Sequence, residues 1–254
     1  MLGPVTALQQ RRLHPKIDRA RFERELEEVL QKPATALQGM HPHMCVPAAL
    51  ESYLAQVDPE GFVELAVGLA SPEGKVRAAG GLTLLRIEDA LEDDGTDRRL
   101  LDRLVQAALF AGAQQLAGRS ITYSSLDHSL DGVPARGLSS VQTEELLEQL
   151  TSQEWSRKRP SLDTLRVAAR QGPVPVVLRV ECGGHQLLLR SLDEHEARLF
   201  DPEGEEARAF PGARLEDGFQ VMSPQALEEH LAQAYLKIEQ IPAEELSPEE
   251  WMLR

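Results

Sequence analysis

The spacing of the apolar residues changes at Gly172-Pro173, and this change limits the folds open to the chain. Before this point, apolar residues recur at intervals of three and four, which is typical of helices with one buried face. After it, short apolar runs alternate with glycine and charged turns, a pattern that indicates strands. Helices followed by an antiparallel sheet predict an α+β fold.

The residues at the ends of each periodic segment place the individual elements. An amphipathic helix is expected over roughly 16–31, and Lys32-Pro33 ends it. Further helices are predicted at 45–54, 62–69, 100–116, 139–150 and 161–172. Strands are predicted at 174–180, 186–190, 197–200 and 219–221, followed by a helix at 223–234 and a return to the sheet within 235–241.

Length and charge narrow the classes of partner. With 254 residues, 42% of them hydrophobic, the chain is long enough to bury a core, and we expect one domain over 1–254. Within it, 58–138 is interpreted as a helical insertion. Lys and Arg number 27 against 41 Asp and Glu, a net charge of −14, which argues against nucleic acid or an anionic membrane surface as a partner.

The distribution of apolar residues and cysteines bears on location. Residues 1–12 lack the continuous apolar core of a signal peptide. No apolar run approaches the roughly 20 residues of a membrane-spanning helix, so no membrane insertion is expected. The 2 cysteines lie far apart in the chain and do not suggest a disulfide scaffold. We therefore expect a cytoplasmic protein, with export by a route that uses no signal peptide left open.

Cys45 begins a predicted helix. It is followed by Val46-Pro47-Ala-Ala-Leu, in which Pro47 suits the first helical turn because its missing N–H is no loss there. The thiolate, and not the thiol, is the nucleophile of cysteine hydrolases, and the N-terminus of a helix favours negative charge. The position of Cys45 therefore indicates a candidate nucleophile.

His185 and Asp201 supply the remaining groups of a catalytic triad. His185 follows Gly183-Gly184 and leads an apolar strand, while Asp201 ends the next strand. An antiparallel hairpin that turns near 193–196 returns Asp201 to within a few residues of the level of His185. The imidazole is then the general base and acid, and the carboxylate orients it.

This ordered set of residues resembles the papain-like cysteine peptidase superfamily. Within it, the bacteriocin-processing, leader-cleaving peptidases look most similar. The likeness is carried by Cys45-Val-Pro-Ala-Ala-Leu and by the two strands between Gly184-His185 and Asp201-Pro202, and it covers the Cys45 helix and about 160–235. The resemblance implies that the helix of Cys45 packs on the C-terminal sheet, that a peptide bond in a protein or peptide substrate is cleaved, and that no cofactor or metal takes part. It also implies that Gln38 donates to the oxyanion, although Gln38 lies one residue farther from the cysteine than is usual in the family.

Other interpretations of these residues stay open. The same triad on the same scaffold serves glutamine deamidases and transglutaminases, and a catalytically inactive relative would act as a binding module. Cys45 alone is also compatible with a small buried hydrophobe, and Cys182 is a rival nucleophile at a strand end. His41, His43 and Cys45 have the alternating spacing of a metal site but lack an evident fourth ligand.

We predict that Cys45 reacts with a thiol probe well before Cys182, since a helix start and an imidazole partner both favour its thiolate. Alkylation of the native protein across pH, followed by peptide mapping, measures the two rates. Equal or reversed labelling of the two cysteines would contradict the assignment of the nucleophile.

Overall fold

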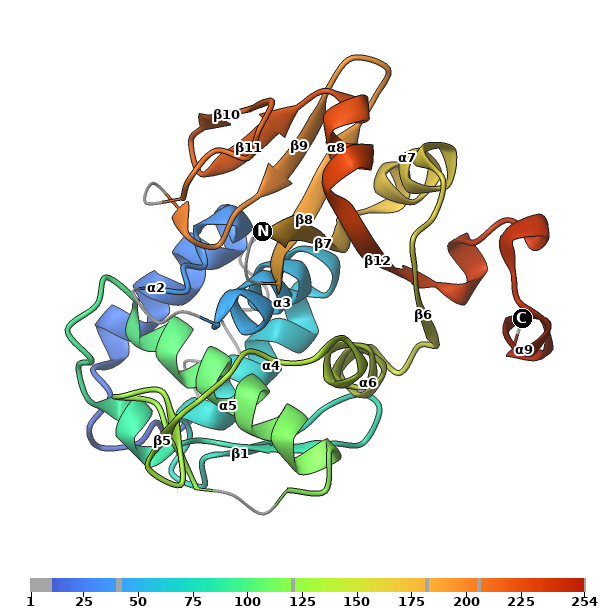
Figure 1. The fold of residues 1–254 in the computed structure, drawn as a ribbon. Coiled ribbons are helices and arrows are strands. Elements are labelled where there is room, and N and C mark those ends of the chain that lie inside the picture. The colour runs from blue at the N-terminus through green and yellow to red at the C-terminus, as the bar shows by residue number, and fades with distance from the viewer. Residues whose placement is uncertain (1–10, 40–42, 120–121, 181–182, 205–206, 254) are drawn as a thin grey trace. The chain divides into compact units, whose positions relative to one another are not determined.

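The computed structural model describes residues 11–39, 43–119, 122–180, 183–204 and 207–253. The chain forms two compact units, a first unit spanning Met1–Ser152 and a second unit spanning Gln153–Arg254 (Figure 1). Helices predominate in the first unit and an antiparallel sheet in the second. The α+β class predicted from the change of pattern is thereby confirmed.

The first unit is a helical assembly with short sheets at its margin. Its helices are α2 (Arg19–Gln31), η1 (Pro33–Thr35), α3 (Cys45–Val57), α4 (Pro59–Ala70), η2 (Glu88–Leu91), α5 (Leu100–Leu116) and α6 (Ser140–Thr151). Its strands are β1 (Lys75–Arg77), β2 (Thr83–Leu85), β3 (Tyr123–Ser124), β4 (Ser129–Leu130) and β5 (Val133–Pro134). Strands β1 and β2 pair with each other, and β3, β4 and β5 form a separate small sheet.

Helix α3 occupies the core of the first unit. All of its residues from Val46 to Ala55 are buried, and α2, α4 and α5 pack against it. A helix that is apolar around most of its circumference has to be enclosed in this way. Since α4 and α5 both come from the segment 58–138, much of that segment belongs to this core.

The second unit is built on one antiparallel sheet. Its strands are β6 (Trp155–Lys158), β7 (Val174–Val180), β8 (Gly183–Leu192), β9 (Ala197–Phe200), β10 (Ala213–Glu216), β11 (Phe219–Met222) and β12 (Leu231–Lys237). In the described part of the chain they follow the order β10-β11-β9-β8-β7-β12-β6. The helices of this unit are α7 (Leu162–Gln171), α8 (Pro224–His230), η4 (Ile238–Gln240), η5 (Ala243–Glu245) and α9 (Pro248–Leu253).

Helices α7 and α8 cover one face of this sheet. Leu165 of α7 and Leu227 of α8 join Leu187, Leu199 and other strand residues in a common buried cluster. Ser161 begins α7 by accepting a hydrogen bond from the Thr164 N–H at 3.1 Å, as a serine at this position is expected to do. In Figure 1 the two helices lie beside β7, β8 and β12.

The predicted helix at 223–234 is partly wrong. Helix α8 ends at His230, and the chain continues directly into β12, which pairs with β7 on one side and β6 on the other. A strand in the interior of a sheet is stabilised by hydrogen bonds on both edges, so tertiary pairing overrides local helix preference here. The papain-like arrangement and the single domain over 1–254 stay predictions.

In the described ranges, no helix combines the length and the apolar character that crossing a lipid bilayer requires.

We expect Leu187→Ala to lower the free energy of unfolding by about 2–5 kcal/mol, because it removes a fully buried side chain from the core of the second unit. Leu215→Ala is the matched control: this leucine lies on the edge strand β10 of the same sheet and is 38% exposed, so its loss should stay within about 0.5 kcal/mol. Urea unfolding of both variants measures the difference. Equal losses would contradict the assignment of this core.

Candidate active site

Cys45 is the first residue of α3, as the sequence predicts, and its side chain is partly exposed. The preceding residue, Met44, provides no side-chain cap, and Pro47 has no N–H. The N–H groups of Cys45 and Val46 lie in the first turn, where a helix has no carbonyl partners of its own for them. This arrangement favours a negative charge beside Cys45.

Gln38 lies in the loop between η1 and α3, and only 4% of it is exposed. The next residue, Gly39, has a φ of +64°, a backbone conformation that glycine adopts without strain. Glycine at position 39 therefore allows the chain to turn directly after Gln38. The structure brings Gln38 and Cys45 into the same unit, and the oxyanion role of Gln38 stays a prediction.

His185 and Asp201 form a hydrogen-bonded pair in the second unit. The distance from His185 Nε2 to Asp201 Oδ1 is 2.8 Å, and Asp201 is only 1% exposed. Strand β8 pairs antiparallel with β9, with Leu188 opposite Phe200, and Asp201 follows directly. His185 shares a strand face with Leu187, and Asp201 continues the face of Leu199. The hairpin was predicted from the sequence, and its register in the structure brings imidazole and carboxylate together.

Gln220 of β11 holds the other oxygen of Asp201. Its Nε2 donates to Asp201 Oδ2 at 2.9 Å and to the Arg208 carbonyl at 2.9 Å, and its Oε1 accepts from the Phe210 N–H at 3.2 Å. Gln220 is fully buried. Both carboxylate oxygens of Asp201 are therefore bound, so the direction in which Asp201 faces His185 is fixed.

This pairing defines the tautomer of the neutral imidazole. An ionised carboxylate only accepts hydrogen bonds, so His185 Nε2 carries the proton and Nδ1 is the basic nitrogen. The ring of Phe210 stacks on His185, with centroids 6.4 Å apart and planes inclined by 22°. Stacking on one face and a hydrogen bond at Nε2 together restrict how the imidazole can turn.

Three potential metal ligands meet at this site. Ligand atoms of His185, Asp201 and the exposed Glu203 lie within 4.8 Å of one another. However, Asp201 Oδ1 already accepts from His185 Nε2 and, at 3.0 Å, from the Glu203 N–H. These contacts match a hydrogen-bonded carboxylate that orients a histidine, and a metal ion would have to replace them.

The candidate residues are divided between the two units, Cys45 and Gln38 in the first and His185 and Asp201 in the second. The structure brings His185 and Asp201 into contact and places Gln38 and Cys45 in the same unit, and the meeting of thiol and imidazole belongs to the proposal below. Two residues of the alternative interpretations lie outside the described residues: His41, of the possible metal site, and Cys182, the rival nucleophile.

Sequence reasoning missed two buried polar residues. Gln220 stands between Phe219 and Val221, where it has the pattern of an ordinary outward residue of a strand, and only the pairing of β11 with β9 places it beside Asp201. His128 has loop-like neighbours in the sequence, yet it is 5% exposed and its Nδ1 lies 2.9 Å from the Tyr123 hydroxyl.

Gly184 has a packing role within the sheet. That Gly183-Gly184 leaves a cleft beside the imidazole clear of side chains stays a prediction from the sequence. A Cβ on Gly184 would approach Val177 Cγ1 to 2.5 Å, so the glycine permits the close approach of β7 and β8.

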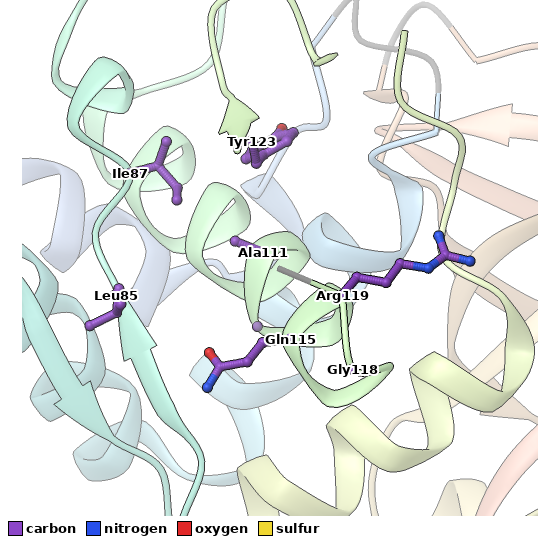
Figure 2. Close-up of a pocket in the computed structure, with 8 residues that line it drawn as sticks. Leu85, Ile87, Ala111, Gln115, Gly118, Arg119 and Tyr123 are labelled. Carbon is purple, nitrogen blue, oxygen red and sulfur yellow. The ribbon is translucent and has the colours of Figure 1, made fainter. Parts of the chain in front are cut away.

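The first unit contains a cavity of about 520 Å³ (Figure 2). Leu85 and Ile87 form one side, and Ala111 and Gln115 of α5 face them. Arg119 and Tyr123 also line it. None of the four predicted site residues contributes to its wall, so the cavity carries no part of the proposed chemistry.

The chain was compared with protein-family models and with curated proteins, and no match was found in either comparison. The papain-like resemblance therefore depends on the residues quoted above.

We predict that Gln220→Leu lowers the free energy of unfolding by about 1–3 kcal/mol, since it leaves a buried carboxylate oxygen without its donor. It should also reduce the fraction of neutral His185 that carries its proton on Nε2, because Asp201 becomes free to turn. Imidazole nitrogen chemical shifts measured by NMR report this fraction.

Gln186→Leu is the matched control for this variant. Gln186 is equally buried, at 1% exposed, and donates to the carbonyls of Val176 and Leu187 but not to Asp201. It should cost similar stability while leaving the tautomer of His185 unchanged. A tautomer shift of the same size in both variants would show that Gln220 has no specific effect on the His185–Asp201 pair.

Proposed function

We propose that this protein is a papain-like, thiol-dependent hydrolase that cleaves a peptide bond in a protein or peptide substrate. Cys45 is the nucleophile, His185 the general base and acid, and Asp201 the group that orients the imidazole. The observation that carries the proposal is the 2.8 Å hydrogen bond between His185 and the buried Asp201. This is the geometry that a catalytic histidine requires.

The proposed reaction proceeds through a thioester. The Cys45 sulfur attacks the carbonyl carbon, its proton having passed to His185 Nδ1, and the carbonyl oxygen gains the negative charge. As the C–N bond breaks, the imidazolium gives that proton to the leaving amine. Water then attacks the thioester with His185 as base, which releases the acid and restores the thiol. The Cys45 N–H and the Gln38 amide are the proposed donors to the oxyanion.

A purely structural histidine–aspartate pair is the simplest alternative. Such a pair would stabilise the fold whether or not it could reach a substrate. Two features favour catalysis instead. First, the side chain of His185 keeps 12% of its surface exposed, while Asp201 is almost fully buried. Second, Gln220 donates hydrogen bonds to Asp201 and to a backbone carbonyl. The contact with Asp201 fixes the carboxylate that orients the imidazole.

Deamidation and transglutamination share the same first half-reaction. In both, Cys45 would attack a glutamine side chain and release ammonia, after which water or an amine would resolve the thioester. Intact mass spectrometry of candidate substrates separates these outcomes from hydrolysis. Two fragments indicate a peptidase, and an uncleaved product of slightly higher mass indicates a deamidase. A folded protein that binds peptides without changing them indicates a binding module.

We predict that Cys45→Ser and His185→Ala each lower kcat/KM by at least about a thousandfold, because each removes a member of the triad. Asp201→Asn should cause a smaller loss, since it disturbs orientation but leaves the base in place. Hydrolysis of a peptide library, followed by mass spectrometry, measures these rates. His195→Ala is the control, since His195 lies in the exposed turn between β8 and β9. Near-normal turnover by His185→Ala would require another base.

A further inference from the structure

The side chain of Gln106 joins the two segments that carry Gln38 and Cys45. Gln106 belongs to α5 and is fully buried. Its Nε2 donates to the Leu37 carbonyl at 2.9 Å and to Glu51 Oε2 at 2.8 Å. Leu37 directly precedes Gln38, and Glu51 lies on α3, the helix that begins at Cys45. One amide group thus ties the loop to the helix.

Glu51, the acceptor on α3, is suited to a hydrogen bond from an uncharged amide such as that of Gln106. Glu51 is completely buried, and burial, together with the nearby Asp102 carboxyl, raises its pKa well above the ordinary value. Asp102 forms an ion pair with Arg99 at 2.9 Å, and burial raises its pKa as well. Burial thus favours the neutral form of Glu51, and a hydrogen bond from an uncharged amide adds no charge to the core.

Residues at the start of α5 also contact the chain on both sides of Gln38, at Thr35 of η1 and at Gly39. Arg99 donates to the Thr35 carbonyl at 2.5 Å and to the Thr35 hydroxyl at 3.2 Å. On the other side of Gln38, a Cβ on Gly39 would approach Arg98 Cγ to 2.8 Å. The loop is therefore bound before Gln38 and closely packed after it, while Gln106 holds the residue adjacent to Gln38.

We propose that Gln106 is a positioning residue for the oxyanion site, which fixes the Gln38 loop relative to the helix of Cys45. This inference rests on the proposed function, because it assigns a catalytic consequence to a contact far from the reacting atoms. It also gives the segment 58–138, interpreted from the sequence as a helical insertion, an indirect part in the proposed chemistry, because Gln106 belongs to it.

The physical argument concerns the precision that an oxyanion donor needs. The charge on the substrate oxygen develops only in the transition state, so the donor has to be in place beforehand. Misplacement by about 1 Å costs on the order of a hundredfold in rate. Gln38 lies outside the helices and strands, so its position depends on the contacts of its loop. The hydrogen bonds of Gln106 link this loop to α3.

Gln106→Leu removes both donated hydrogen bonds, and also the one that Gln106 Oε1 accepts from Arg98 Nη1 at 3.4 Å, while keeping most of the volume. We expect kcat for peptide hydrolysis to fall about 10–100-fold with little change in KM, because positioning matters mainly in the transition state. Hydrogen exchange of the backbone within 33–39, followed by mass spectrometry, should become about tenfold faster. If Gln106→Leu does not fold, Gln106→Asn keeps a buried amide that is too short to bond both acceptors, and the same two changes are expected.

Gln114→Leu is the matched control on the same helix. Gln114 is 3% exposed and accepts from Gln142 of α6 at 3.2 Å, so its loss should leave both kcat and exchange within 33–39 unchanged. If the wild type is active and the Gln106 and Gln114 variants match in both measurements, the inference is overturned. If the wild type cleaves no peptide but exchange still differs, the proposed function fails and the catalytic consequence assigned to Gln106 fails with it.

Discussion

A polar group that loses water on folding has to find a partner within the protein, and this requirement shapes both halves of the candidate site. In the second unit, Gln220 satisfies the Asp201 oxygen that faces away from His185. In the first unit, Gln106 satisfies the Leu37 carbonyl and Glu51 at once. Each glutamine is fully buried and bridges segments that are distant in sequence. An uncharged amide suits this role, because it donates and accepts without placing an isolated charge in the core.

The sequence predicted the parts of the fold that depend on local pattern. The strand over 174–180, the helix over 100–116 and the start of α3 at Cys45 are found as expected, since apolar periodicity and helix-start residues act over a few neighbouring positions. The hairpin that pairs His185 with Asp201 was also accessible, because only a short turn separates β8 from β9. Local signals therefore led to the candidate site residues but not to what holds them in place.

The elements that the sequence did not yield depend on long-range pairing. The return to the sheet predicted within 235–241 begins earlier, at Leu231, because strand β12 follows α8 without a break and is fixed by partners that lie up to roughly 80 residues earlier in the chain. Strands β6 and β10 lack the apolar runs that made the equally short β9 and β11 recognisable. Gln220 and Gln106 occupy polar positions within apolar elements, where a pattern alone cannot separate a solvent-facing residue from one that binds a buried partner. Only the register between strands and the packing between helices make that distinction.

The division of the candidate residues also has a consequence for catalysis. Each unit orders its own groups through its own buried hydrogen bonds: the His185–Asp201 pair is assembled within the sheet, and the Gln38 loop is tied to the Cys45 helix within the helical unit. Within each unit, the entropy of aligning the groups is thus lost during folding, before the proposed reaction begins. What the proposed reaction still requires is that the Cys45 thiol and His185 Nδ1 meet. The proposed chemistry would then depend on two halves that are each ordered before they meet, so weakening either glutamine bridge should lower the rate even though both Cys45 and His185 are kept.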